Sequence, residues 1–307
     1  MAEENFPTSA ARGAAASNAA FSAPPTPWGS LPVEQYLLRN WDPSSPLSAT
    51  AQREQLVRAF IQSDPPETEP APVTPSPEQI RNILEPWRPQ KLRRIAHEHA
   101  NSGPSCQFYF LRTYYGDPPK YHDAALAEFL DELEDCMSAD LSPEDWWYVV
   151  LDDAEFFSVG EEEDWERKVY DVFPELAAPR AKKLLTDTNV YYIRDMLEWL
   201  TPDGTVEEED LAEAVRSVIR HDGHRLVLMD REAFQTGRFG LVFRDAKGNV
   251  VRRVRATVED LGDVNISDFR GALTEQWFWL DAEVGSKYRV GGEIVSPMVD
   301  AIKETYL

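Results

Sequence analysis

Apolar residues recur at helical spacing through the stretch Leu141–Trp165, which is both aromatic and acidic. Ser142 and Pro143 are typical of the first residues of a helix, because serine caps free backbone N–H groups and proline fits the first turn. The apolar positions that follow at three- and four-residue steps are Trp147, Val150, Leu151, Ala154 and Phe157. This spacing predicts a helix that begins at Ser142 and lies at the centre of a helical body.

The chain on either side carries further amphipathic patterns. Helices with one apolar and one polar face are predicted over His122–Cys136, Trp165–Phe173, Asn189–Leu200 and Glu207–Arg220. The aromatic run Cys106–Tyr115 is short enough for either a buried strand or the start of a helix, and periodicity does not decide between them.

After Gly223 the pattern changes to the alternation that is typical of strands. Phe239–Arg244 and Val250–Val258 alternate around the turn residues Asp245–Asn249, which predicts a hairpin. A closing helix is expected from Ser296. Further strands are expected at Arg225–Met229, Gln276–Val284 and Lys287–Val295. A run of helices followed by a run of strands predicts an α+β fold, with a mainly helical body, then a small antiparallel β-sheet and a closing C-terminal helix.

Composition divides the chain into five regions. Residues 1–30 are rich in Ala, Ser and Pro and are expected to form a disordered tail. Two short docking helices are expected in 31–63, and a proline-rich linker in 64–77. The acidic helical region spans 78–222, and the antiparallel sheet region that packs on these helices spans 223–307.

The net charge of −23 is concentrated in the middle of the chain. Between Asp117 and Val215 there are 29 acidic and 7 basic side chains. A negative field of this size repels phosphate backbones, so no nucleic-acid partner is expected. The simplest interpretation of the excess is a solvated acidic surface.

Hydrophobic residues make up 42% of the sequence, which is enough for a substantial core. No stretch approaches the roughly 18 to 20 apolar residues that a membrane span requires, and the N-terminus shows no signal-peptide pattern. The two cysteines, Cys106 and Cys136, do not indicate a disulfide framework. We therefore expect no membrane partner and an intracellular protein of the cytoplasm or nucleus.

The sequence contains no motif for a nucleophile, a phosphate-binding loop or a dinucleotide fold. His97, His99, His221 and His224 are interpreted as surface residues at helix ends, because their spacing supports a metal site only weakly. We therefore predict no catalytic residue, no cofactor and no metal site.

The predicted hairpin carries a strip of basic residues in an otherwise acidic protein. The candidate residues for binding an anionic ligand or an acidic partner are Arg244, Arg252, Arg253 and Arg255. Two other interpretations stay open: the strip docks onto the protein's own acidic helices, or its arginines are simply solvated.

The lack of catalytic motifs and the many Trp and Tyr residues favour a non-enzymatic protein that binds a protein partner. Such a protein would use its acidic, aromatic-rich helical surface and a flexible N-terminal arm. The candidate contact residues of the arm are Trp28, Tyr36, Leu37 and Trp41. The alternative is an enzyme or ligand-binding protein with an anion-binding pocket at the junction of the helices and the sheet.

Overall fold

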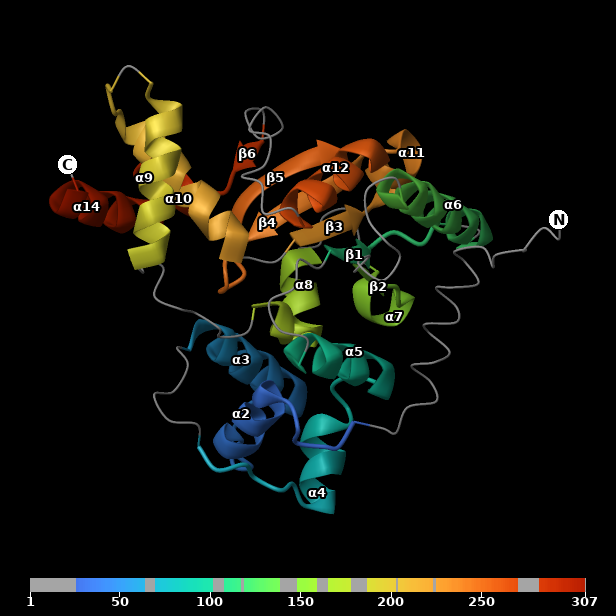
Figure 1. The fold of residues 1–307 in the computed structure, drawn as a ribbon. Coiled ribbons are helices and arrows are strands. Elements are labelled where there is room, and N and C mark those ends of the chain that lie inside the picture. The colour runs from blue at the N-terminus through green and yellow to red at the C-terminus, as the bar shows by residue number, and fades with distance from the viewer. Residues whose placement is uncertain are drawn as a thin grey trace, which may run out of the picture.

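In the computed structural model of the chain, six strands among the described residues form one sheet between two layers of helices (Figure 1). The structure describes residues 26–63, 70–101, 108–116, 119–138, 148–158, 165–177, 187–202, 204–222, 225–269 and 282–306. Each face of the sheet has its own hydrophobic core, because successive residues of a strand point to opposite faces.

The sheet combines parallel and antiparallel strands. Its strands are β1 (Phe108–Arg112), β2 (Tyr148–Leu151), β3 (Arg225–Met229), β4 (Phe239–Arg244), β5 (Val250–Ala256) and β6 (Glu283–Val284). Their order across the sheet is β2-β1-β3-β4-β5-β6. β1 runs parallel to both of its neighbours, with Phe110 opposite Val150 of β2 and Val227 of β3. The remaining pairs, from β3 to β6, are antiparallel.

The prediction of a purely antiparallel sheet confined to the chain after Gly223 is therefore wrong. β1 comes from the aromatic run Cys106–Tyr115, in the region where a helical body was expected. It pairs in parallel with β3 across more than a hundred residues of sequence. A strand that is buried on both faces reads as a continuous apolar run, so its pattern resembles that of a buried helix.

β2 was not predicted, because it lies within the helix predicted from Ser142. Val149, Val150 and Leu151 are consecutive apolar residues, and such a run fits a helical stripe as well as a buried strand. Residues 139–147, which include the predicted start of that helix, lie outside the described residues. After β2 comes a short helix, α7 (Ala154–Phe157), which is capped by the side chain of the preceding residue, Asp153.

The upper layer in Figure 1 packs against one face of the sheet. Its helices are α6 (Pro119–Ser138), α9 (Asp187–Leu200), α10 (Glu208–Asp222), α11 (Arg231–Thr236), α12 (Val258–Phe269) and α14 (Val295–Tyr306). Phe129 of α6 contacts Phe110 of β1 and Phe239 of β4, with ring centroids 5.5 and 3.9 Å apart. The apolar stripes predicted for α6 and α9 are buried in this upper core, including Leu126, Leu133, Ile193, Met196 and Leu197.

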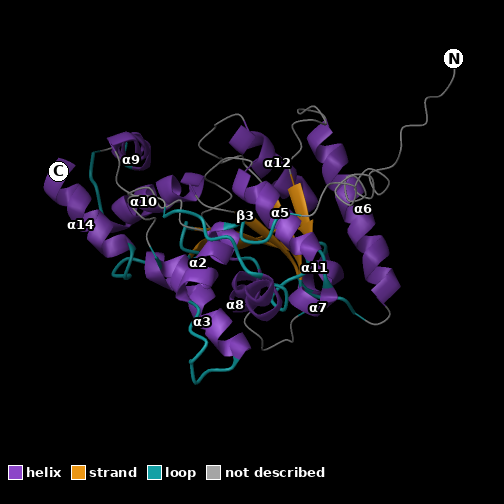
Figure 2. Ribbon diagram, turned by 90° about the horizontal axis from the view of Figure 1, so that it is seen from below, coloured by secondary structure: helices purple, strands orange, loops and turns teal. Residues whose placement is uncertain are grey.

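The lower layer covers the opposite face of the sheet, and Figure 2 shows several of its helices in front of the strands. Its elements are α2 (Pro32–Asn40), α3 (Ala49–Gln62), α4 (Pro77–Gln79), the π-helical turn η1 (Ile80–Leu84), α5 (Gln90–Asn101), α7, α8 (Trp165–Val172) and the 3-10 turn η3 (Pro174–Ala177). Leu37 of α2 and Val57 of α3 have no exposed surface and lie in this lower core with Tyr109 of β1. Helices α2 and α3 therefore pack within the folded body.

The hairpin predicted between β4 and β5 is confirmed. Asp245 accepts hydrogen bonds from the backbone N–H groups two and four residues later, at 2.9 and 2.8 Å. Gly248 completes the turn with a φ of +78°, a conformation that favours glycine. The strand expected at Lys287–Val295 is absent from the described chain: β6 is only two residues long, and Ser286–Tyr288 forms the 3-10 turn η4.

Candidate functional site

Arg252, in the predicted basic strip, is buried and paired inside the protein. Its guanidinium contacts the carboxylate of Glu213 in α10, which also binds Arg216 at 2.9 Å. Burial lowers the pKa of Arg252, while the charge of Glu213 acts in the opposite direction. The pair ties strand β5 to helix α10.

Arg253 and Arg255 have partners on the other side of the same strand. Arg253 pairs with Glu283 of β6 at 2.7 Å, and Arg255 pairs with Asp230 at 2.6 Å. The hydrogen bond to Asp230 raises the pKa of Arg255. Because neighbouring residues of a strand point to opposite faces, Arg252 and Arg253 do not meet at one ligand.

Arg244, the fourth residue of the strip, is buried at the end of β4. Its Nη1 atom donates to the carbonyl oxygen of Gly248 at 3.0 Å. Its guanidinium lies 5.0 and 4.8 Å from the rings of Trp165 and Tyr170 in α8. The structure thus does not bring the four arginines together, and each has contacts within the chain.

The candidate contact residues of the N-terminal arm lie in or against the lower core: Trp28, Tyr36, Leu37 and Trp41. Leu37 has no exposed surface. The ring of Tyr36 lies 5.5 Å from that of Phe60 in α3. These side chains are engaged in packing the protein's own helices.

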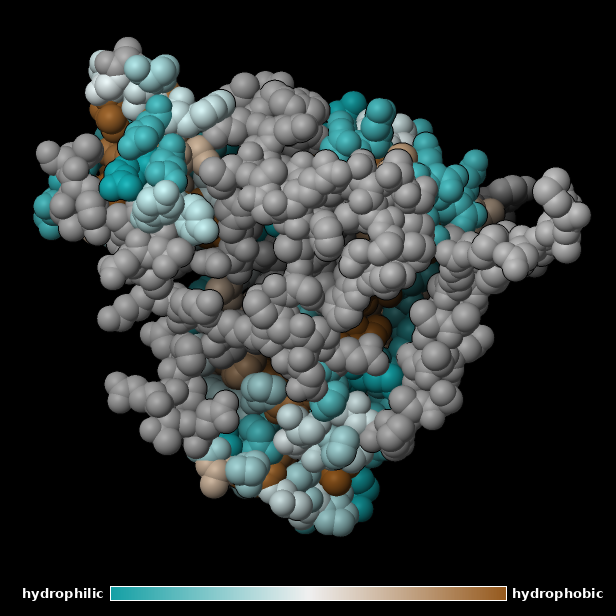
Figure 3. Space-filling view, viewed as in Figure 1, coloured by the Kyte–Doolittle hydropathy of each residue, from teal (hydrophilic) through white to brown (hydrophobic). Residues whose placement is uncertain are grey.

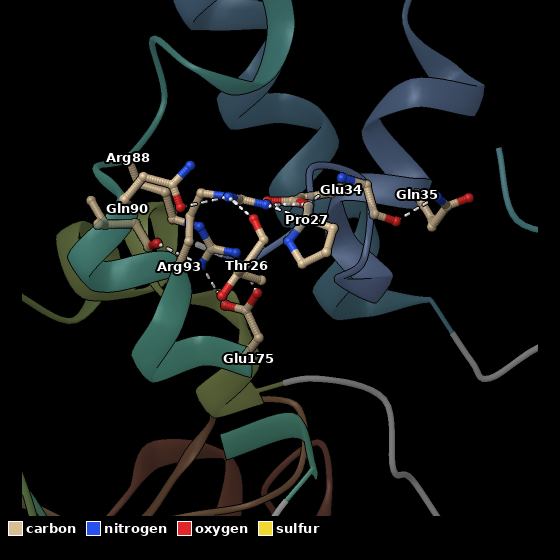
Figure 4. A network of polar contacts seen from close by, with 10 residues as sticks. Thr26, Pro27, Glu34, Gln35, Arg88, Gln90, Arg93 and Glu175 are labelled. Carbon is tan, nitrogen blue, oxygen red and sulfur yellow. Dashed lines mark hydrogen bonds and ion pairs between the residues drawn. The ribbon is translucent and has the colours of Figure 1, made fainter. Parts of the chain in front are cut away.

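A buried ion pair holds the start of the described chain against α2 and α5 (Figure 4). Glu34 and Arg93 are both fully buried, with Nε of Arg93 2.6 Å from Oε1 and Nη2 3.0 Å from Oε2 of Glu34. Arg93 also donates to the carbonyl oxygens of Thr26 and Pro27, each at 2.9 Å, and the ring of Trp28 lies 3.7 Å from its guanidinium. Buried charges are tolerated when their polar atoms are satisfied in this way, which indicates a structural role.

A second buried pair in Figure 4 joins Arg88, just before α5, to Glu175 of η3. Nη1 and Nη2 of Arg88 donate to the two carboxylate oxygens at 2.7 and 2.6 Å. Beside this pair, His99 of α5 contacts the hydroxyl of Tyr109 and the carbonyl oxygen of Glu175, the latter at 3.0 Å. These bonds connect α5 to η3 and to β1.

The outer face of helix α9 is different, because its aromatic side chains are exposed. The exposed fractions of Tyr191, Tyr192 and Trp199 are 54%, 46% and 62%. The opposite face, with Ile193 and Met196, is buried in the upper core. In Figure 3 the corner that carries α9 and the start of α10, at the upper left, is coloured mainly teal to white, with some brown.

This exposed aromatic face was not predicted, although the sequence carries a signal for it. The buried stripe of α9 fixes which way the helix faces, and Tyr191, Tyr192 and Trp199 fall between the positions of that stripe. A residue off the stripe must point to the solvent or to another partner. Large aromatic residues at several such positions are therefore informative.

Acidic residues lie on α9 itself and at the start of the neighbouring helix α10. Asp195 and Glu198 lie on α9, between the tyrosines and Trp199. Helix α10, which packs beside α9, begins with Glu208 and Glu209. Glu208 pairs with Lys303 of α14 at 3.5 Å. The α9 face thus combines exposed rings with carboxylates.

Among the described residues, no group of three or more His, Cys, Asp or Glu side chains is arranged to hold a metal ion. None of the helices in the described part of the chain has the length and apolar character needed to cross a membrane. Comparison of the chain with models of protein families, with curated proteins and with solved structures found no match.

Proposed function

We propose that this is a non-enzymatic protein that binds a basic segment of a partner protein through the outer face of α9. The observation that carries the proposal is the exposure of Tyr191, Tyr192 and Trp199 on one helix. Tyr and Trp dominate the binding energy of many protein interfaces, because each buries a large area at a small cost in conformational freedom. A partner that covers these rings would remove their apolar surface from water.

The spacing of the three rings suits a single partner segment. The ring centroids of Tyr191 and Tyr192 are 6.0 Å apart. Trp199 follows Tyr192 by seven residues, which is two helical turns or about 10 Å along the axis. Arg194 lies with its guanidinium 5.3 Å from the ring of Tyr191, a contact that illustrates how a cation fits on this face.

The charge of the face supports a basic partner. Asp195 and Glu198 lie among the rings, and the protein as a whole carries a net charge of −23. Lysine or arginine side chains of a partner would pair with these carboxylates and would also stack on the exposed rings. Electrostatic attraction would in addition speed the encounter of the two proteins.

Other surfaces have less support as the contact site. Leu37 of the N-terminal arm is completely buried, and Tyr36 packs against α3. In the alternative with an anion pocket, Arg252 and Arg255 would bind the ligand, but Glu213 and Asp230 already balance their charges.

The proposal is tested with three synthetic peptides of about 20 residues, the size of one side of a standard interface. They have equal apolar content and carry lysine and arginine, glutamate, or serine at their polar positions. Biolayer interferometry on the immobilised full chain should detect binding of the basic peptide alone, and its affinity should fall as salt is added. Equal binding of all three peptides, or binding of none, would contradict the proposal.

A further inference from the structure

The carboxyl ends of the parallel strands β1 and β2 form a topological switch point in the sheet (Figure 1). From β1 the chain passes to α6, whose Leu126 and Phe129 lie in the upper core. From β2 it passes to α7, whose Phe157 lies in the lower core. The two connections thus leave the sheet on opposite faces. In open sheets with parallel strands, ligands bind at such points, beyond the carboxyl ends of the strands.

Four polar side chains meet beyond these strand ends. Arg112 is the last residue of β1, Tyr115 follows it, Asp123 lies near the start of α6, and Asp152 follows β2. Nη1 of Arg112 is 2.7 Å from Oδ1 of Asp123 and 3.4 Å from Oδ2 of Asp152. The ring of Tyr115 lies 4.5 Å from the guanidinium, and its hydroxyl donates to the carbonyl oxygen of Arg112 at 3.2 Å. We call these residues the switch-point cluster.

One nitrogen of the Arg112 guanidinium, Nη2, has no acceptor among the described residues. The Arg112 side chain is only 2% exposed, and its Nε atom donates to the carbonyl oxygen of Tyr114 at 3.2 Å. Nη2 is buried and has no hydrogen-bond partner within the described part of the chain. A buried N–H group without an acceptor is unfavourable, and an oxygen of a ligand would satisfy it.

The carboxylates of the cluster are accessible from the solvent. Asp123 is 59% exposed and Asp152 is 35% exposed, so a ligand in solution can reach both carboxylates. Burial, followed by the charge of Asp152, raises the pKa of Tyr115, so this phenol keeps its proton at neutral pH. Two carboxylates face one guanidinium, and the resulting negative charge disfavours phosphate and carboxylate ligands.

We propose that the switch-point cluster binds a neutral polyhydroxylated ligand, such as a sugar. A hydroxyl group is a donor and an acceptor at once. Its oxygen would accept a hydrogen bond from Nη2 of Arg112, while its proton goes to Asp123 or Asp152. A neutral hydroxylated ligand therefore satisfies both the N–H donor of Arg112 and the carboxylate acceptors without adding charge to the site.

Aromatic rings next to the cluster fit the same ligand class. The guanidinium of Arg112 lies 5.7 Å from the ring of Phe234 in α11. The rings of Phe234 and Tyr114 are 6.3 Å apart. The guanidinium of Arg231 lies 5.5 Å from the ring of Tyr114 and covers part of it. The C–H groups of a sugar ring would pack against the apolar ring surface beside it. This binding site is separate from the α9 face, so neither proposal depends on the other.

The test uses the full chain and a panel of neutral mono- and disaccharides, with binding detected by saturation-transfer-difference NMR. At least one sugar should bind in a saturable manner, with a Kd on the order of 1 mM. Inorganic phosphate and glycine, which stand for anions and zwitterions, should neither bind nor compete. Binding of phosphate or glycine in place of sugars would overturn the proposal, and so would the absence of saturable binding across the panel.

Variants locate the binding to the cluster. Asp123→Asn and Asp152→Asn should each weaken sugar binding by about tenfold or more, because the stronger acceptor is lost. Glu283→Gln is the matched control, since Glu283 is a half-exposed carboxylate that pairs with Arg253 near the opposite edge of the sheet. It should leave the affinity unchanged. Thermal melts identify any variant that fails to fold. Unchanged affinity in both folded Asp variants would overturn the proposal.

Discussion

Glu34 of α2 and Arg93 of α5 form a doubly hydrogen-bonded ion pair that has no contact with solvent. The two residues are 59 positions apart in the sequence. A single charge left at this depth would be strongly unfavourable, so each residue holds the other's helix in place. The same pair fixes the start of the described chain, because Arg93 binds the carbonyl oxygens of Thr26 and Pro27.

Glu34→Gln should therefore lower the free energy of unfolding by about 3–5 kcal/mol, since it leaves the charge of Arg93 buried without its carboxylate. Urea denaturation measures this loss. Glu54→Gln is the control, because Glu54 pairs with Arg58 on the exposed surface of α3, where a pair contributes at most about 1 kcal/mol. A loss of that small size for Glu34→Gln would show that the buried pair does not hold α2 and α5 together.

Leu37→Ala tests whether α2 belongs to the folded body. Leu37 is completely buried in the lower core, so its truncation should cost about 2–5 kcal/mol in a denaturant melt. Leu47→Ala is the control: this leucine is 44% exposed, and its truncation should change the stability by less than about 0.5 kcal/mol. If both variants are equally stable, α2 does not pack on the folded body in solution. The N-terminal arm would then again be a candidate site of contact with a protein partner.

Much of the helical layer could be predicted from the sequence. The aliphatic residues of α6 and α9 recur at helical spacing, and this period identifies a helix without any knowledge of its neighbours. The parallel strands could not be predicted in the same way. Val149 and Leu151 of β2 pack in the lower core and Val150 packs against the upper core, so the strand has apolar residues on both faces and lacks the alternation that marks a half-exposed strand.

The contacts of the candidate sites could be predicted only in part. The basic strip was expected to dock internally, to bind an anion or to remain solvated, and Arg252 contacts Glu213, which lies 39 residues away. Local pattern does not encode a pairing at that distance. Arg112 and Asp152 meet only because β1 and β2 are parallel neighbours. Since the sequence predicted a helix in place of β2, the switch-point cluster could not be predicted either.

Tyr288 of η4 gives the protein a defined response to alkaline pH. Its hydroxyl donates to Oδ2 of Asp245 at 2.7 Å. Burial, followed by the charge of Asp245, raises the pKa of Tyr288 above its ordinary value of 10.0. The unfolded chain loses this proton near pH 10, whereas the folded chain retains it to higher pH. The contribution to stability is therefore complete below pH 10 and is lost as the pH rises towards the folded pKa.

Urea unfolding between about pH 8 and pH 11 should accordingly give a free energy that falls with pH above 10. Tyr288→Phe should be less stable by about 1 kcal/mol at pH 8, because one hydrogen bond is lost, but its decline should be shallower. Tyr115, whose pKa is also raised, accounts for part of the slope that remains. Identical slopes in the two proteins would show that Tyr288 does not contribute to the alkaline decline.

Trp199→Ala and Tyr192→Ala remove exposed rings and change no charge. They therefore separate the α9 face from the general negative field of the protein, which attracts any basic peptide. Because Tyr192 is 46% exposed and Trp199 is 62% exposed, the double variant should unfold at nearly the same urea concentration as the unmodified chain. If the stability is unchanged, a loss of peptide binding results from the missing rings of the α9 face and not from unfolding.

The most direct test of the proposed function is the affinity of the basic peptide for three proteins at physiological salt. These are the unmodified chain, the Tyr192→Ala/Trp199→Ala variant, and a control variant with Leu47→Ala and Val290→Ala, which removes two exposed apolar side chains elsewhere. The proposal predicts that the α9 variant binds at least about tenfold more weakly, as expected for interface aromatics, while the control is unchanged. Equal affinities for all three proteins would contradict it.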